Sequence, residues 1–391
     1  MSRLRESPSP DLARLVADGY EVSIRHGHLV ISNVPYLTAA GDIAKGEVVS
    51  ELNVSGDTTV PPEPHTVYFT GVPHKAASVP VDEILAGTGT QEPIPGLFAE
   101  SYLSTKPASG HYADYYEKIS QYVRVIAGYA RTVDPRATAR TFRPIETEDD
   151  ESPFVYLDSA SARAGISALS MRLAAGPIGI IGLGGSGSYI LDLVSKTPVP
   201  EIHLWDPDDF LTHNAFRAPG AASLAQLSER PTKVEYFASQ YSAVHRGIVA
   251  HPEMIDNSTL ERLDGLHFVF VAIDTSPLKR EIILWLTKHG IPIIDVGMGV
   301  IRQQDALGGI VRTTTVTPAD HAHVERRISF TDEREDEYER NIQLADLNAL
   351  NAAIAVIKWK KLMGFYRDDL KELHTTYTIA TGQLIHSEKP S

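Results

Sequence analysis

Between positions 178 and 296 the apolar residues fall into short continuous runs, separated by stretches with helical spacing. Residues 266–273 form an uninterrupted apolar run, which is typical of a central parallel strand covered on both faces. Strands are predicted at 178–183, 201–206, 247–252, 266–273 and 291–296, and helices at 189–194, 221–227, 232–244 and 276–289. This alternation of strands and helices predicts an α/β, doubly wound, Rossmann-like domain.

After residue 296 the pattern changes to longer alternating segments. Residues 297–302 and 307–317 are predicted to extend the sheet with antiparallel strands, and 375–380 to close it. A long helix is predicted over 338–363, which Gly364 is placed to end. The polar stretch 318–339 is predicted to be a mobile crossover segment or a plain solvated loop.

The first third of the chain predicts a separate, smaller α+β domain. A short helix at 12–18, a hairpin of 20–24 and 28–32, and strands at 48–52 and 66–71 precede an amphipathic helix over 111–130. The five tyrosines of that long helix are expected to be half-buried packing residues, with a recognition face as the alternative. We therefore predict an α+β domain over 1–134, a linker over 135–155 and the main domain over 156–391.

Charge and hydropathy limit the partners that the chain can have. It has 391 residues and a net charge of −14, from 36 basic and 50 acidic side chains. An acidic surface disfavours broad binding to nucleic acids or membranes. Because no apolar run reaches the roughly 18 residues of a membrane span, and the start does not resemble a signal peptide, we expect a soluble cytoplasmic protein.

The chain contains no cysteine. This composition excludes disulfides, cysteine-ligated zinc and a thiol nucleophile on the chain itself. Any covalent intermediate on this chain would need a different acceptor group.

A glycine-rich turn joins the strand at 178–183 to the helix that follows. Glycines let the main chain approach an anion closely, and a helix N-terminus supplies free N–H groups, so the turn predicts a phosphate cradle. Asp206 ends the next strand, 24 positions after Gly182, close to the spacing at which an acid reaches a ribose hydroxyl. A simple turn residue before Pro207 is the alternative for Asp206.

The residues around and after the turn match a longer pattern. Its elements, in order, are Gly182, Gly184, Gly185 and Gly187 in G-x-G-G-x-G, Asp206 and Asp208 in D-x-D, Asn214 and Arg217 in N-x-x-R, then Lys233, and Asp274 at a later strand end. Over residues 156–385 the chain thus resembles the ThiF/MoeB/ubiquitin-activating enzyme (E1-like) superfamily. Its N-terminal region is similar to those that accompany ThiF-like domains in some prokaryotic, bacterial proteins, and distantly to a ubiquitin-conjugating-enzyme fold.

The resemblance implies an adenylyltransferase, a transferase that joins the C-terminal glycine of a ubiquitin-like protein to AMP from ATP. It assigns phosphates to the glycine loop, Arg217 and Lys233, and Mg2+ to Asp274. Asp206 would hold the ribose, while Asp208 and Asn214 would brace the site. Helical geometry alone gives no reason for a lysine at 233, because cations are unfavourable at a helix N-terminus, and Asp274 could instead cap the following helix. A homodimer is also implied.

Two departures from the family pattern stand out. Many members carry C-x-x-C zinc ligands and a cysteine that accepts the activated tail, and this chain has neither, so no zinc is expected. The family's R-Y-x-R-Q helix, whose arginine reaches the partner subunit's nucleotide, is also missing. Arg163 or Arg172 is the available substitute, although each is also typical of a surface arginine.

The acyl-adenylate therefore has three possible fates. It could pass to a thiol on another protein, such as a ubiquitin-conjugating-enzyme-like partner, to a sulfur carrier, or to a hydroxyl of this chain as an oxyester. Candidate hydroxyls near the crossover are Thr313, Thr314, Thr315, Thr317, Ser329 and Thr331, with His321 and His323 close by in sequence. A hydroxyl would need such a base to become an effective nucleophile.

Two other functional classes remain open. A nicotinamide-dependent oxidoreductase would share the glycine loop and Asp206, but it does not account for Arg217, Lys233 and Asp274. An inactive nucleotide-binding scaffold would keep the fold and bind ATP without releasing pyrophosphate. The intact charged residues favour an active enzyme over a scaffold.

Overall fold

The computed structural model describes residues 9–56, 58–143, 152–164, 166–274, 276–330 and 342–390. The chain divides into two compact units, one of Met1–Ser152 with Tyr156–Met171 and the other of Pro153–Val155 with Arg172–Ser391. The predicted acceptor Thr331 and the acidic run at 146–151 lie outside the described residues.

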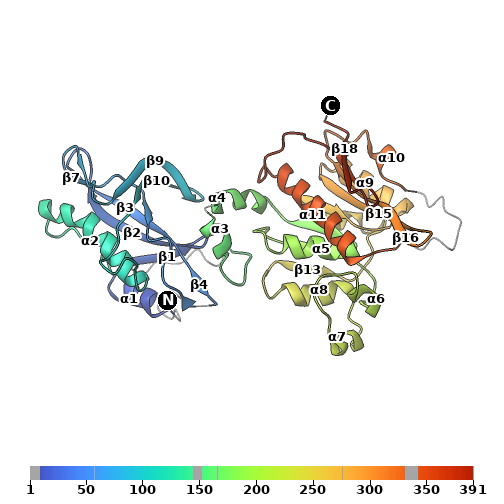
Figure 1. Ribbon diagram of the computed structural model, residues 1–391, viewed down its shortest axis with the longest axis horizontal. Helices are drawn as coiled ribbons and strands as arrows, with labels where there is room; N and C mark the ends of the chain where they lie inside the picture. Colours follow the sequence, from blue (N-terminus) through green and yellow to red (C-terminus); the bar gives the residue numbers. More distant parts are fainter. Residues whose placement is uncertain are drawn as a thin grey trace. The chain divides into compact units, whose positions relative to one another are not determined.

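The first unit is built on a twisted, largely antiparallel sheet with two helices, α1 (Pro10–Ala17) and α2 (Tyr115–Val133), over one face (Figure 1). The strand order is β8-β7-β2-β3-β6-β10-β9, with β1 beside β2. The strands are β1 (Glu21–Arg25), β2 (His28–Leu37), β3 (Ile43–Glu51), β6 (Val67–Phe69), β7 (His74–Ala76), β8 (Val79–Pro80), β9 (Leu85–Ile94) and β10 (Leu97–Leu103), with a separate ribbon of β4 (Val54–Ser55) and β5 (Thr58–Thr59). The predicted early helix, first hairpin and late helix are confirmed.

The tyrosines of helix α2 serve as packing residues. Tyr115 and Tyr122 are fully buried, and their hydroxyls donate to the carbonyl oxygens of Glu51 and His65. The helix begins at Tyr115 rather than at residue 111, because the side chain of Asp114 accepts a hydrogen bond from the Glu117 N–H and caps it.

Two short helices after the linker group with the first unit. They are α3 (Ser159–Arg163) and α4 (Ser167–Ser170), and α4 packs against β9. The Ser167 hydroxyl donates to the carbonyl oxygen of His26 at 3.3 Å. Residues 156–171, which the sequence pattern placed at the start of the main domain, thus make their contacts with the first unit.

The second unit contains an eight-stranded mixed sheet, which confirms the predicted α/β class for this part of the chain. The strand order is β13-β12-β11-β14-β15-β16-β17-β18, parallel from β13 to β15 and antiparallel from β15 to β18. The strands are β11 (Ile178–Ile181), β12 (Ile202–Trp205), β13 (Ile248–His251), β14 (Phe268–Val271), β15 (Ile293–Gln303), β16 (Ala306–Val316), β17 (His374–Thr378) and β18 (Gln383–Ser387).

Helices cover both faces of the parallel part. Helices α5 (Gly185–Val194), α8 (Lys233–Tyr241) and α11 (Ala345–Leu362) bury side chains such as Trp359 against Ile180 and Leu204 on one face. Helix α9 (Pro277–Lys288) packs against Trp205 and Val269 on the other face. Alternate residues of each strand therefore enter two different cores.

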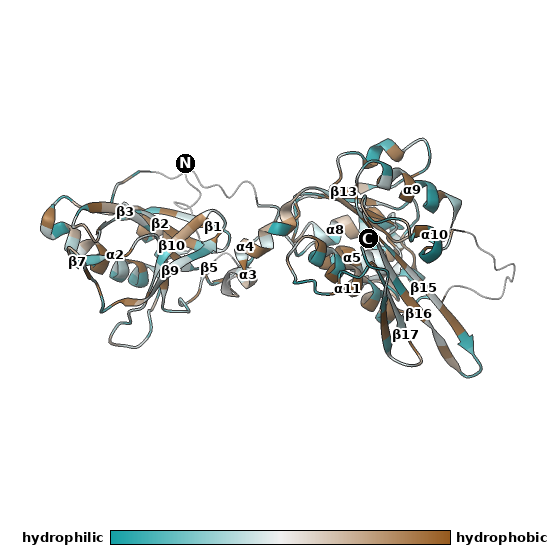
Figure 2. Ribbon diagram, turned by 90° about the horizontal axis from the view of Figure 1, so that it is seen from above, coloured by the Kyte–Doolittle hydropathy of each residue, from teal (hydrophilic) through white to brown (hydrophobic). Residues whose placement is uncertain are grey.

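The antiparallel end of the sheet differs from the sequence expectation. The predicted strand at 291–296 and the predicted extension at 297–302 form one continuous strand, β15, and β18 adds a strand that was not predicted. The outer ends of β15, β16 and β17 project beyond the helices of this unit (Figure 2). Among the described residues, no helix is long and apolar enough to cross a membrane.

Candidate functional site

Three parallel strands of the second unit end side by side. Ile181, at the end of β11, pairs with Trp205 of β12 and with Val271 of β14. The Gly182 N–H donates to the Trp205 carbonyl oxygen, and the Ala272 N–H donates to that of Ile181, both at 2.8 Å. Residues just after these strands therefore meet at one edge, which is where open α/β sheets bind their ligands.

The four glycines of the turn have different physical reasons to be glycine. Gly182 has φ +90°, and a Cβ on Gly187 would lie 1.9 Å from the Gly182 carbonyl oxygen. A Cβ on Gly185 would overlap the side chain of Asn348. Gly184 is different, because a Cβ there would meet no atom within 4 Å. Three glycines are required by packing, and the fourth faces open space at the N-terminus of helix α5.

Asp206 braces the glycine loop from beneath. Its carboxylate is buried and accepts hydrogen bonds from the N–H groups of Leu183 at 2.7 Å and Asp208 at 3.0 Å. The amine of Lys233 lies 3.1 Å from the same carboxylate. Asp206 is therefore a structural link between the loop and the next strand end, a role that spacing alone did not reveal.

Lys233 is buried in an ionic cluster with two acids. Beside its contact with Asp206, its amine lies 2.6 Å from Asp208 Oδ2, and the Asp208 side chain is 67% exposed. Lys233 is the first residue of α8, which Thr232 caps in a capping box with Glu235. The two carboxylates offset the unfavourable interaction of this cation with the helix N-terminus.

Asn214 and Arg217 lie together in the turn after Asp208. Buried Asn214 accepts a hydrogen bond at Oδ1 from the Leu211 N–H and so shapes the short helix α6 (Thr212–Ala215). Arg217 is half-buried, and its Nε is buried with no hydrogen-bond partner among the described residues. A buried guanidinium donor without a partner is costly, which favours an anion as the missing partner.

Asn348 is the site residue that the sequence analysis missed. It is buried in α11, accepts a hydrogen bond from the Ser186 hydroxyl at 3.0 Å and donates to the Arg217 carbonyl oxygen at 3.4 Å. It thereby ties the start of α5 to the arginine turn. Two asparagines one turn apart, Asn348 and Asn351, in the mostly apolar stretch 347–357 were the available signal.

Asp274 lies three residues after the end of β14 and is exposed. It does not cap the next helix, because the Ser276 hydroxyl accepts the Lys279 N–H and fills that role. Its carboxylate has no partner among the described residues. One free carboxylate beside a phosphate cradle suits Mg2+, which is usually held by one or two carboxylates plus phosphates. No group of three or more His, Asp or Glu side chains able to hold a metal occurs in the described part of the chain.

Three of the five proposed hydroxyl acceptors that the structure describes are buried. Thr313, Thr314 and Thr315 are buried in β16. Thr317 is half-buried and accepts the Asp320 N–H, whereas Ser329 is exposed. Of the described hydroxyls in the predicted set, Thr317 and Ser329 therefore remain the accessible ones.

The predicted bases and the substitute arginine are also engaged. Buried His323 lies with Nε2 2.8 Å from the Thr315 carbonyl oxygen, and exposed His321 contacts the carbonyl oxygen of Pro318. Arg172 donates to the carbonyl oxygen of Gly364 within its own unit. Arg163 lies in α3, which groups with the first unit.

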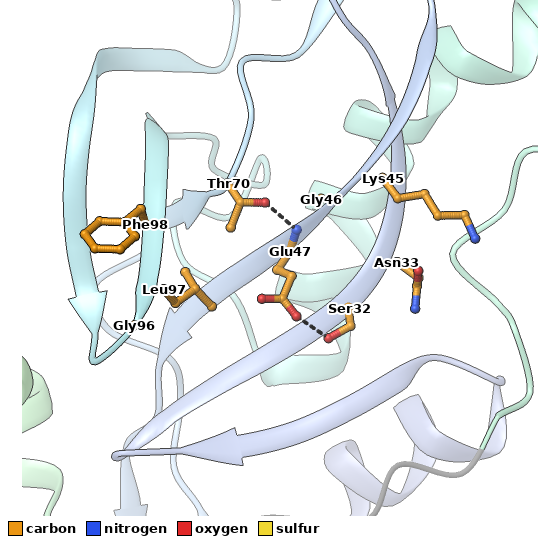
Figure 3. A pocket seen from close by; sticks show the side chains of 9 residues that line it. All are labelled: Ser32, Asn33, Lys45, Gly46, Glu47, Thr70, Gly96, Leu97 and Phe98. Atoms are coloured by element: carbon orange, nitrogen blue, oxygen red, sulfur yellow. Dashed lines mark hydrogen bonds between the residues drawn. The ribbon is translucent and has the colours of Figure 1, made fainter.

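The first unit has a cavity of its own, of about 390 Å³ (Figure 3). Glu47 lies at its base and accepts hydrogen bonds from the hydroxyl of Ser32 at 2.5 Å and from Arg25 at 2.9 Å, while Phe98 forms an exposed rim. The cavity is lined by Ser32, Asn33, Lys45, Gly46, Glu47, Thr70, Gly96, Leu97 and Phe98. The one carboxylate of this lining is therefore already paired with Ser32 and Arg25.

Comparison with protein families gives a match in the first part of the chain. A family model described as a domain of unknown function (DUF6791) matches residues 10–159. No curated protein sequence matches the chain.

Several solved structures resemble part of the chain at low identity. A crystal structure of E. coli MccB with MccA-N7isoASN is 15% identical with a TM-score of 0.48, covering 58% of this chain and 68% of that one. E. coli MccB with ATP is 14% identical with a TM-score of 0.44, covering 59% and 70%. Selenomethionine PaaA is 17% identical with a TM-score of 0.44, covering 56% and 75%.

Proposed function

We propose that the second unit is an ATP- and Mg2+-dependent adenylyltransferase of the E1-like, Rossmann-like type, and that it activates the C-terminal glycine of a ubiquitin-like protein. The observation that carries this proposal is that three groups follow the adjacent strand ends of β11, β12 and β14. They are a glycine loop open at Gly184, the unpartnered Nε of Arg217 and the free carboxylate of Asp274. These groups also follow one another along the sequence in the same order as in the E1-like superfamily that the sequence resembles.

The residues divide between holding phosphates and holding the site in shape. The N–H groups at the start of α5 and the guanidinium of Arg217 would bind phosphate oxygens, and Asp274 would hold Mg2+, which neutralises phosphate charge when bound. Asp206, Asn214 and Asn348 brace the loop and the arginine turn through their hydrogen bonds. Lys233 would keep the local charge balanced.

The reaction itself needs positioning more than proton transfer. The terminal carboxylate of the substrate attacks the α-phosphorus of ATP, the bond to the bridging oxygen breaks, and pyrophosphate leaves with its electron pair. A carboxylate is already a nucleophile, so no general base is required. Negative charges must be brought together, so oriented donors and cations dominate the catalysis. Loss of one such donor costs about 3–4 kcal/mol of barrier, a hundred- to a thousandfold in rate.

Asp206 and Lys233 contact each other, which bears on the roles proposed for both. Both oxygens of the Asp206 carboxylate are occupied by main-chain N–H groups and Lys233. A ribose hydroxyl could approach this carboxylate only as an additional partner. The Asp208 carboxylate is largely exposed, so Lys233 could exchange this partner for a phosphate without leaving Asp206. We therefore propose bracing as the first role of Asp206.

The product's next acceptor is proposed to lie on another protein. The chain lacks cysteine, and three of the described candidate hydroxyls are buried in β16. A thiol on a ubiquitin-conjugating-enzyme-like partner, or a sulfur carrier, would accept the acyl group directly. An oxyester at Thr317 or Ser329 is the remaining route on the described part of the chain.

The second unit is also proposed to form a homodimer. Beside the arginine turn, Phe216 and Leu224 are 82% and 84% exposed, as expected of residues that a second copy would cover. Light scattering should give twice the chain mass of 42.8 kDa. A monomer at all concentrations would contradict this part of the proposal.

The test is ATP–pyrophosphate exchange with a small glycine-ended β-grasp protein encoded beside this one. Exchange should depend on that protein and on Mg2+, and D274A should abolish it. D264A is the matched control, because Asp264 is also exposed but precedes β14, whereas Asp274 follows it. Measurable ATP binding without exchange for any neighbouring carrier would favour the scaffold and refute the enzyme.

A further inference from the structure

A buried ionic cluster lies behind the Asp274 loop, in a position that the proposed chemistry does not use. Lys279 of α9, Asp295 of β15 and Arg312 of β16 have relative side-chain exposures of 2%, 0% and 15%. The Lys279 amine is 2.5 Å from Asp295 Oδ1, and Arg312 donates to Oδ2 at 2.7 Å. One carboxylate thus bridges two cations that come from different elements.

Stability alone does not account for this cluster. Burying ions is expensive, and apolar side chains of similar volume commonly serve a core equally well or better. The surroundings are apolar, since Ile282 and Ile293, both fully buried, belong to the core on this face of the sheet. A long apolar side chain at position 279 would suit that core.

Lys279 has a second contact, which links the cluster to the site. Its amine donates to the Ile273 carbonyl oxygen at 3.2 Å, and Ile273 directly precedes Asp274. Among the described residues, Lys279 is the one side chain that donates to a carbonyl oxygen between β14 and α9. The loop is otherwise held by the Ala272 N–H on one side and the Ser276 cap on the other.

The direction of the Asp274 carboxylate therefore depends on the main chain before it. Its side chain has no partner among the described residues that could orient it. The same peptide segment lies against the glycine loop, because a Cβ on Gly182 would come within 2.5 Å of the Ala272 carbonyl oxygen. A small rotation at Ile273 would move the carboxylate relative to the phosphate cradle.

We propose that Lys279 is a positioning residue, anchored by Asp295, that fixes the Ile273 carbonyl and thereby holds Asp274 where it binds the Mg2+ of the nucleotide. This inference rests on the proposed function. The pair of Lys279 and Asp295 would therefore affect the binding of Mg2+ but not the other contacts of the nucleotide. Arg312 keeps the anchor in place from β16, where it lies flat over Gly297.

The test measures how ATP binding depends on Mg2+, which requires no carrier protein. Titration calorimetry of the full chain with ATP at graded Mg2+ concentrations gives the half-maximal Mg2+ concentration. In K279M this concentration should rise about tenfold, since loss of a group that orients a metal ligand typically weakens metal binding ten- to a hundredfold. ATP affinity at saturating Mg2+ should stay close to that of the wild type.

K358M is the matched control. Lys358 is another buried lysine of the same unit, paired with Glu372 at 3.2 Å and donating to that residue's carbonyl oxygen, away from the site. Both variants should lower the thermal midpoint, and K279M alone should shift the Mg2+ dependence. An equal shift in both variants, or none in a folded K279M, would overturn the proposal.

A second variant decides the matter if K279M does not fold. D295N keeps the shape of the side chain but removes the negative anchor of Lys279, and it should shift the Mg2+ dependence in the same direction by severalfold. An unchanged dependence in D295N would then refute the positioning role. If the wild-type chain binds no ATP at any Mg2+ concentration, the proposed function itself fails, and this inference fails with it.

Discussion

Gly184 and Gly187 lie three residues apart, yet substitution by alanine should have different effects, on ATP binding at the first and on stability at the second. In G187A the new Cβ would lie 1.9 Å from the Gly182 carbonyl oxygen, whereas ordinary contacts begin at 3.4 Å. Helix α5 or the loop must therefore move. Overpacking of this kind costs about 1–3 kcal/mol, which lowers the thermal midpoint by about 2–12 °C for a unit of this size.

G184A should leave the fold intact and weaken nucleotide binding. Its Cβ would meet no atom within 4 Å, and φ at this position is −68°, outside the left-handed region that favours glycine. The methyl group would instead occupy the space from which a phosphate approaches the main chain. Loss of one hydrogen bond to a charged group costs about 1.5–3 kcal/mol, so ATP should bind about ten- to a hundredfold more weakly.

The two variants are compared by thermal unfolding and by calorimetric titration with ATP and Mg2+. We expect G187A to lose stability, and G184A to lose ATP affinity without a matching loss of stability. If G184A binds ATP as tightly as the wild type, the open side of this glycine does not face the phosphates. If G187A has the same thermal midpoint as the wild type, the close approach of Gly187 to the Gly182 carbonyl oxygen is wrong.

Three further predictions use the same structure. R217M should weaken ATP binding at least tenfold without lowering the thermal midpoint, because the buried Nε has no partner to lose; an unchanged Kd would contradict this. N348A and N351A should each lower the free energy of unfolding by about 1–3 kcal/mol, as measured by denaturant titration. Only N348A should weaken ATP binding in calorimetry, because Asn348 bonds Ser186 at the start of α5, whereas Asn351 bonds Thr313 and Gly297. Burial lowers the pKa of Lys118 from 10.5 to about 7, so between these values the unfolded chain holds more protons; protection of α2 amides from hydrogen exchange should rise from pH 7 to 9, below the titration of unfolded tyrosines, and stay flat in K118M over that range.

Hydrophobic spacing predicted a helix or strand correctly where one face, or the whole element, is buried. The run at 266–273 became β14, a central strand with every residue buried. Prediction was less accurate at boundaries that depend on a partner. Helix α2 begins where Asp114 caps it, and α11 begins at Ala345 rather than at residue 338. Strand β18 has mostly exposed residues and owes its place to pairing with β17, so periodicity could not identify it.

The candidate site was predictable to the extent that it lies at strand ends. Gly182, Asp206 and Asp274 each follow a buried strand, and parallel pairing brings such positions to one edge. Asn348 was not predictable in this way, since it lies 162 positions from Ser186, from whose hydroxyl it accepts a hydrogen bond. Only the packing of α11 against α5 brings the two residues together.

Residue type and short-range spacing were enough to predict the α/β alternation, the glycine turn and the charged groups. What those groups contact depends on the packing of distant segments. That packing ties Lys233 to two acids, makes Asp206 a brace, leaves Arg217 Nε without a partner and anchors the loop before Asp274 through Lys279. The reason is physical: burial and ion pairing depend on which distant segments pack together, and the spacing of residues along the chain does not contain that information.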